Sequence, residues 1–129
     1  SSEIKNLPSH FRPEEKVLNS IGIYTWEELK CLTDKELNQI TVRKTCSNHN
    51  LNKLRGIAVL ICELNISLQD AAILLYIGIS SLKTLTKYTP VEILRKIGRL
   101  ERNLGAADLN AFNHQKIHDL ILFAKSKQI

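Results

Sequence analysis

The sequence predicts an all-α protein whose two similar helical repeats pack as one compact domain. Signals for helix starts occur along the whole chain, and strand signals are almost absent. The segment Ile21–Thr25 (IGIYT) also returns 56 positions later as Ile77–Ser81 (IGISS). A recurrence at such a spacing is typical of one supersecondary unit that is built twice.

The recurrence extends well beyond this segment, and it divides the chain into predicted units 1–64 and 65–129. The further matching pairs are Leu18 with Leu74, Leu29 with Leu85, Thr33 with Thr89 and Glu36 with Glu92. With 129 residues, 43% of them hydrophobic, the chain is long enough to bury a core.

The elements of each unit follow from local signals. Short helices are expected over 12–20 and 26–32 in the first unit, and over 68–76 and 81–87 in the second. Gly22 and Gly78 are expected to end the first helix of each unit, because glycine readily takes the left-handed conformation that closes a helix.

Three helix starts are marked by a threonine with a glutamate three positions later. This pattern at Thr25, Thr33 and Thr89 is the capping box, in which the two side chains satisfy the free N–H groups of the first turn. Pro90 fits the first helical position. Long helices are predicted over 50–64 and 113–126, with polar loops at 41–49 and 103–112. Their apolar positions are Leu51, Leu54, Ile57, Ala58, Ile61 and Leu64, then Ile117, Leu120, Ile121 and Ala124.

Charge and apolar content restrict the class of partner. The net charge of +5 is compatible with an anionic partner, although a solvated basic surface is the open alternative. No apolar run approaches the roughly 18 residues of a membrane helix, so no membrane partner is expected. Three cysteines, Cys31, Cys46 and Cys62, are an odd number that favours a reducing, cytoplasmic location with buried free thiols.

Catalytic and metal-binding patterns are weak. Cys46 and His49 resemble half a zinc site, but no second close pair completes it. His114 and His118 have a chelating spacing without a third ligand. Because no phosphate loop, dinucleotide fingerprint or nucleophile elbow occurs, we expect no enzyme activity, cofactor, metal or small-molecule substrate.

Two segments resemble the C-terminal domain of the bacterial RNA polymerase alpha subunit. Residues Leu64–Leu74 (LNISLQDAAIL), running on to Ile77–Ile79, are similar to its L-x-L-S-V-R-S-x-N-C-L…L-G-I stretch, and Thr33–Leu37 is similar to its T-E-x-E-L segment. The resemblance implies helix-hairpin-helix units. In such units a glycine hairpin presents backbone N–H groups at a helix N-terminus to one DNA phosphate.

The tandem layout also resembles a bacterial family, domain of unknown function 4332, over about residues 7 to 126. In that family the second unit typically reads G-V-G-x-x-x-A-x-L-L before A-G-V-x-T. Here Asn65–Ser67 stands in the G-V-G position, Ala71 matches the alanine, and Ile73–Leu74 matches the leucine pair.

The sequence departs from the DNA-binding pattern at both hairpins. Asn65 can still take a left-handed conformation and Ser67 can cap the next helix, so the second hairpin is expected to keep its shape. The first hairpin offers only Ser9–Phe11. The positions of the alpha subunit's DNA-contacting Arg and Asn are occupied by Gln69 and Ala72.

One predicted helix carries a basic stripe. Arg95, Arg99 and Arg102 fall at i, i+4 and i+7, beside apolar positions. A thinner basic set in the first unit consists of Arg43, Lys44, Lys53 and Arg55.

Two functions remain open. The first is weak, sequence-independent nucleic-acid (DNA) binding through helix N-termini and the stripe. Its candidate residues are Asn65, Ser67, Gln69, Lys83, Lys87, Arg95, Lys96, Arg99 and Arg102, with Arg12 in the first unit. The second is a protein–protein interaction adaptor that has lost the DNA-binding hairpins. Trp26 is expected in the core or in the packing between the two units, and it would be a plausible partner anchor if exposed.

Overall fold

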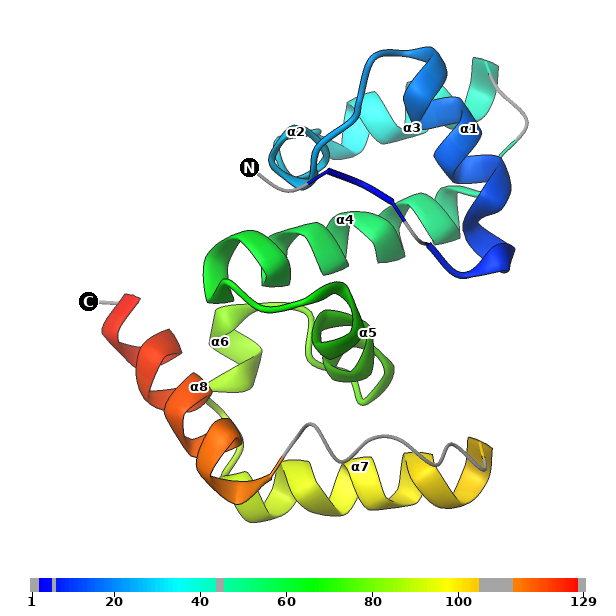
Figure 1. The fold of residues 1–129 in the computed structure, drawn as a ribbon. Coiled ribbons are helices and arrows are strands. Elements are labelled where there is room, and N and C mark those ends of the chain that lie inside the picture. Colours follow the sequence, from blue (N-terminus) through cyan, green and yellow to red (C-terminus); the bar gives the residue numbers. More distant parts are fainter. Residues whose placement is uncertain (1–2, 6, 44–45, 105–112, 128–129) are drawn as a thin grey trace. The chain divides into compact units, whose positions relative to one another are not determined.

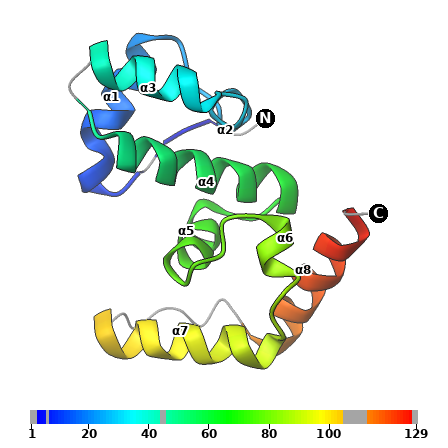
Figure 2. The same ribbon diagram turned by 180° about the vertical axis from the view of Figure 1, so that it is seen from behind.

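The computed structural model describes residues 3–5, 7–43, 46–104 and 113–127, with side chains as far as Arg99 in the third range (Figures 1 and 2). Within these ranges the only β interaction is an isolated antiparallel bridge between Glu3 and Thr25. The all-α prediction is therefore confirmed. The elements are η1 (Ser9–Phe11), α1 (Arg12–Ser20), α2 (Trp26–Lys30), α3 (Asp34–Arg43), α4 (Asn48–Leu64), α5 (Leu68–Tyr76), α6 (Leu82–Leu85), α7 (Pro90–Leu104) and α8 (His114–Lys127).

The chain divides into two compact units, Ser1–Cys62 and Glu63–Ile129. In the first unit, α1, α2 and α3 lie along one side of α4 (Figure 1). In the second unit, α8 packs on α6 and α7. That the two units form one compact domain stays a prediction.

Each unit has an aliphatic core of its own. The apolar stripe predicted on α4 is buried, and so are Ile117, Ile121 and Ala124 of α8. Trp26 is only 3% exposed, which confirms its expected place in a core. Each large side chain removed from water in this way contributes roughly 1.5–3 kcal/mol before the cost of ordering the chain.

The glycine-closed helix ends have the predicted left-handed geometry. Gly22 has φ 84° and Gly78 has φ 94°. Ile23 N donates to the Leu18 carbonyl at 2.9 Å, and Ile79 N donates to the Leu74 carbonyl at the same distance. This six-residue bond belongs to the Schellman motif, which satisfies carbonyls left free at the end of a helix.

The three predicted capping boxes are present. Thr33 N donates to Glu36 Oε1 at 3.0 Å, and Glu36 N donates to Thr33 Oγ1 at 3.1 Å. Thr89 and Glu92 make the same pair of bonds at the start of α7, and Thr25 forms a box at the start of α2. Local sequence chemistry therefore determines these helix starts.

Several predicted boundaries were wrong. The expected loop 41–49 is helical at both ends, because α3 continues to Arg43 and α4 already begins at Asn48. Residues 44–45 and 105–112 lie outside the described residues, and α7 reaches Leu104. The short helices α2 and α6 end at Lys30 and Leu85, earlier than expected.

The expectation of buried thiols was also wrong. Cys31 is exposed, Cys46 and Cys62 are partly buried, and none of the three takes part in a disulfide among the described residues. Cys31 is exposed because α2 stops at Lys30, which places the cysteine at the helix end instead of on its buried face. Partial burial, together with the charge of Glu14, raises the pKa of Cys46. Within the described ranges, none of the helices has the length and apolar character needed to cross a membrane.

Candidate nucleic-acid interface

The turn before α5 has the left-handed residue and the serine cap that the sequence suggested. Asn65 has φ 57° and is the one non-glycine residue with positive φ in the described part of the chain. Ser67 caps α5, since its hydroxyl accepts from Asp70 N at 3.1 Å. The side chains of Asn65, Ser67 and Gln69 are exposed. The first backbone N–H groups of α5, at Leu68 and Gln69, have no acceptor within the helix.

A buried carboxylate lies in the same first turn. Asp70 is 7% exposed, and its Oδ2 accepts from Lys116 Nζ of α8 at 2.7 Å. A negative charge at this position opposes the binding of a phosphate, but the Lys116 ammonium compensates it locally. The outer side of the turn therefore presents neutral donors.

The start of α1 in the first unit has a different shape. Ser9–Phe11 forms the 3-10 helix η1, which leads directly into α1. Phe11 is 5% exposed and is part of the core. Arg12 is exposed at the first position of α1, but it follows no left-handed turn. Of the two predicted hairpins, only the second has the left-handed geometry.

Helix α7 presents two arginines on its outer side. Ile93 and Ile97 are 0% and 3% exposed and face the core, whereas Arg95 and Arg99 are exposed one turn apart. Lys96 is partly buried, with its Nζ 5.2 Å from the centroid of the Tyr88 ring. This is a cation–π contact.

Two lysines precede α7, and both Lys83 and Lys87 are exposed. Arg102 falls within α7, but its side chain lies outside those described.

Acidic residues are scarce along this stretch. From Ile79 to Arg99 the sequence contains five Lys or Arg residues and one carboxylate, Glu92. The backbone N–H of Thr89 is the main cause that lowers the pKa of Glu92, with smaller contributions from the Thr89 hydroxyl and from the charges of Arg95 and Lys96. Glu92 is therefore committed to the cap of α7, and the outer side of the helix stays basic.

The thinner basic set of the first unit is partly structural. Arg55 donates to the Leu32 carbonyl at 3.0 Å and pairs with Asp34, so it ties α4 to the start of α3. Arg43 is exposed and Lys53 is partly buried. Lys44 lies outside the described residues.

Two buried charged residues were missed from the sequence. Glu14 is 2% exposed, and its carboxylate accepts from Ser47 N at 2.9 Å and from Asn50 Nδ2 at 3.1 Å. Asp70, 56 positions later, bonds Lys116. An acidic residue recurs at the 56-position offset, and this recurrence could have indicated that Glu14 and Asp70 have equivalent structural roles.

These two carboxylates make equivalent links. Asn50 and Lys116 each stand three residues after the capping residue of a long helix, which is Ser47 for α4 and Asn113 for α8. Each carboxylate therefore ties the first helix of its unit to the start of the last.

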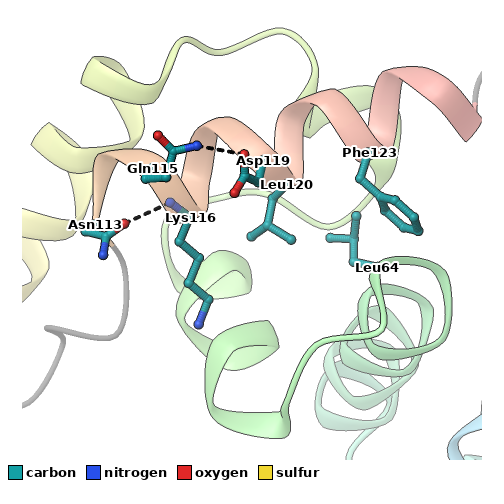
Figure 3. A pocket seen from close by; sticks show the side chains of 7 residues that line it. All are labelled: Leu64, Asn113, Gln115, Lys116, Asp119, Leu120 and Phe123. Atoms are coloured by element: carbon teal, nitrogen blue, oxygen red, sulfur yellow. Dashed lines mark hydrogen bonds between the residues drawn. The ribbon is translucent and has the colours of Figure 1, made fainter.

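A shallow depression on α8 was not predicted from the sequence either (Figure 3). Its apolar part is formed by Leu64, Leu120 and Phe123. Its polar side chains bond within the protein: Asn113 caps α8, Gln115 Nε2 donates to Asp119 Oδ1 at 2.9 Å, and Lys116 pairs with Asp70. Because these polar side chains already bond within the protein, the lining residues do not offer a set of polar groups that converge on a small ligand.

The histidines of α8 stack without a third ligand beside them. The rings of His114 and His118 lie 6.4 Å apart, with an angle of 11° between their planes. Among the described residues, no three His, Cys, Asp or Glu side chains gather in a group able to hold a metal ion.

Fold and surface together define an all-helical protein of two compact units, one of which carries a basic face. The chain belongs to the family described as Domain of unknown function (DUF4332), whose sequence profile matches residues 8–127. Neither the curated proteins nor the solved structures gave a match.

Proposed function

We propose that this chain is a non-enzymatic module whose second unit binds nucleic acid weakly and without sequence preference. The observation that carries the proposal is the exposed pair Arg95 and Arg99 on α7, within a stretch whose single carboxylate is engaged in a helix cap. Arginine and lysine bind phosphate oxygens at any base sequence, and each contact releases a counterion.

The turn at Asn65 supplies a second contact of the same kind. A left-handed residue followed by a serine cap and two free backbone donors offers neutral N–H groups to a phosphate oxygen. The resemblance to helix-hairpin-helix units and to the alpha-subunit domain supports this use of the turn by analogy. Because few contacts are available, the expected affinity is low.

The alternative is a protein–protein adaptor that has lost DNA binding. Gln69 and Ala72 favour it, since they replace the arginine and the asparagine by which the alpha-subunit domain contacts DNA. If the chain is such an adaptor, it should not bind nucleic acid at any salt concentration.

The test is a fluorescence-anisotropy titration with a short labelled DNA duplex over a series of salt concentrations. We compare the wild type, the double variant Arg95→Glu/Arg99→Glu, and the matched control Lys35→Glu/Arg43→Glu on α3. For the wild type, the logarithm of the binding constant should fall linearly with the logarithm of the salt concentration.

The α7 variant should lose most of its affinity, and the magnitude of its slope should fall by roughly 2. The α3 control, which carries the same change in net charge, should keep the wild-type slope. Equal losses of affinity in both variants would show that binding depends only on net charge. An absence of binding at low salt would favour the adaptor.

A further inference from the structure

Two histidines lie on one exposed side of α8. His114 is the first residue of the helix, and His118 follows four positions later, so the two side chains lie on successive turns of the same side. The buried residues Ile117, Ile121 and Ala124 hold a different side of α8 in the core. Both histidines are therefore left exposed to solvent.

The imidazole rings of this pair interact only with each other. Their centroids are 6.4 Å apart, and their planes differ by 11°. Among the described residues, neither ring makes a hydrogen bond or an ion pair. A neutral imidazole in this situation keeps a nitrogen lone pair available for a metal ion. Copper, nickel and zinc ions are well suited to such nitrogen ligands.

The separation of the rings is close to the one that a shared ion requires. A Zn–N bond is about 2.0–2.1 Å long, so two imidazoles on one tetrahedral ion have ring centroids about 5 Å apart. The observed separation of 6.4 Å is somewhat larger. Rotation about the side-chain torsions of two exposed rings can remove the difference while the helix backbone stays in place.

The neighbouring charged side chains of α8 are engaged elsewhere. Lys116 Nζ donates to Asp70 Oδ2 of α5 at 2.7 Å, and Asp119 Oδ1 accepts from Gln115 Nε2 at 2.9 Å. The imidazole nitrogens are thus the ligands that this side of the helix offers. The partial positive charge of the helix N-terminus opposes a cation, so binding should be weaker than at a closed site of three or four protein ligands.

We propose that His114 and His118 chelate one divalent transition-metal ion of the copper, nickel and zinc class. Each histidine supplies one nitrogen, and water completes the coordination shell. This site of two protein ligands revises the sequence-based expectation that the chain holds no metal. It lies on α8 and does not depend on the nucleic-acid binding proposed for α7 and for the turn at Asn65.

The test is isothermal titration calorimetry with Ni²⁺ on the full chain, prepared without a histidine tag. The chain contains four histidines, so the four single alanine variants form a complete series. His114→Ala and His118→Ala should each weaken Ni²⁺ binding by at least about tenfold, because each removes one of the two ligands. His10→Ala and His49→Ala are matched controls at exposed histidines, and they should leave the affinity unchanged.

A second measurement shows whether the folded helix holds the ion. In urea denaturation, Ni²⁺ at about 100 times its dissociation constant should raise the folding equilibrium constant of the wild type about 100-fold. The same Ni²⁺ concentration should give an increase about tenfold smaller in His118→Ala. Without metal this variant should keep the wild-type melting temperature, since the side chain is exposed. Binding should be tighter for Cu²⁺ than for Ni²⁺ and absent for Mg²⁺, as nitrogen ligands require.

Several results would overturn the proposal. Ni²⁺ affinity that survives both His114→Ala and His118→Ala would place the ion elsewhere on the chain. Equal losses of affinity in all four variants would show that the spacing on α8 has no special role. Binding that leaves the folding equilibrium unchanged would show that the helical arrangement does not hold the ion, and an absence of Ni²⁺ binding would exclude the site altogether.

Discussion

Two buried carboxylates determine how the long helix of each unit begins. Glu14 bonds the backbone and the Asn50 side chain at the start of α4, and Asp70 bonds Lys116 at the start of α8. A carboxylate near a helix N-terminus is stabilised by the free N–H groups and by the helix dipole. Glu14 is stabilised in this way by the start of α4, whereas Asp70 is stabilised by the positive charge of Lys116.

The bonds between Glu14 and the start of α4 should contribute measurably to the free energy of unfolding. Glu14→Ala leaves Ser47 N and the Asn50 amide without their acceptor, so the free energy of unfolding should fall by about 1–3 kcal/mol. Urea denaturation measures the difference. The control is Glu15→Ala on the same helix, which should stay within about 0.5 kcal/mol of the wild type. An equal loss in both variants would assign the effect to α1 in general.

The glycines at the ends of α1 and α5 are needed for their backbone conformation. A Cβ added at Gly22 or Gly78 meets nothing within 4 Å, so a substitution is costly only because φ is positive. Gly22→Ala and Gly78→Ala should each destabilise the chain by roughly 1–2 kcal/mol. The corresponding asparagine variants should lose less, because asparagine tolerates the left-handed region. Equal losses for alanine and asparagine would contradict this explanation.

At the level of the helices, the capping glutamates introduce a dependence on pH. Backbone N–H groups of Tyr24, Thr33 and Thr89 are the main cause that lowers the pKa of Glu28, Glu36 and Glu92, respectively. A carboxyl group whose folded-state pKa is lowered stabilises the fold above its unfolded pKa of about 4.3. This stability is lost as the pH falls through the folded-state pKa.

The stability of the wild type should therefore decrease as the pH is lowered from about 5 to about 3. The double variant Glu36→Gln/Glu92→Gln should lose less over the same window, because a glutamine oxygen can accept in the box without titrating. Urea midpoints at the two pH values measure both changes. Identical losses in the two proteins would show that these boxes do not contribute to the acid sensitivity.

Helix starts were predictable from the sequence where their chemistry is local. The boxes at Thr33 and Thr89 and the closing turn at Gly78 are each encoded within a few residues, and all were confirmed. The end of α3 was not predictable in this way. The helix passes through Thr41 and ends at Arg43, although threonine is a weak helix former, and the Thr41 hydroxyl donates to the Leu37 carbonyl at 2.6 Å.

Contacts between distant residues were harder to predict. The bond from Asn50 to Glu14 joins residues 36 positions apart, so no local pattern encodes it. For the candidate interface, the exposure of Arg95 and Arg99 followed from helical spacing, and the left-handed Asn65 followed from its residue type. The depression beside Ile40 takes side chains from three segments of the chain, so no local sequence pattern predicts it.

At the scale of the molecule, two units with matching local geometry differ in their outer surfaces. The second unit has the Asn65 turn and the arginines of α7, and the first has the exposed Val42 and the depressions of α3. Because the backbone features match while the outer side chains differ, the two units are expected to differ in what they bind. The proposed nucleic-acid binding therefore belongs to the second unit.

The most direct test is a two-dimensional nitrogen–proton NMR titration of the full chain with a short DNA duplex at low salt. If the second unit binds DNA, amide shifts should change along Asn65–Gln69 and Lys83–Arg99, and the changes should reverse when salt is added. Amides of α3 in the first unit should stay in place. Changes confined to Arg12–Arg43, or no change at low salt, would contradict the assignment of nucleic-acid binding to the second unit.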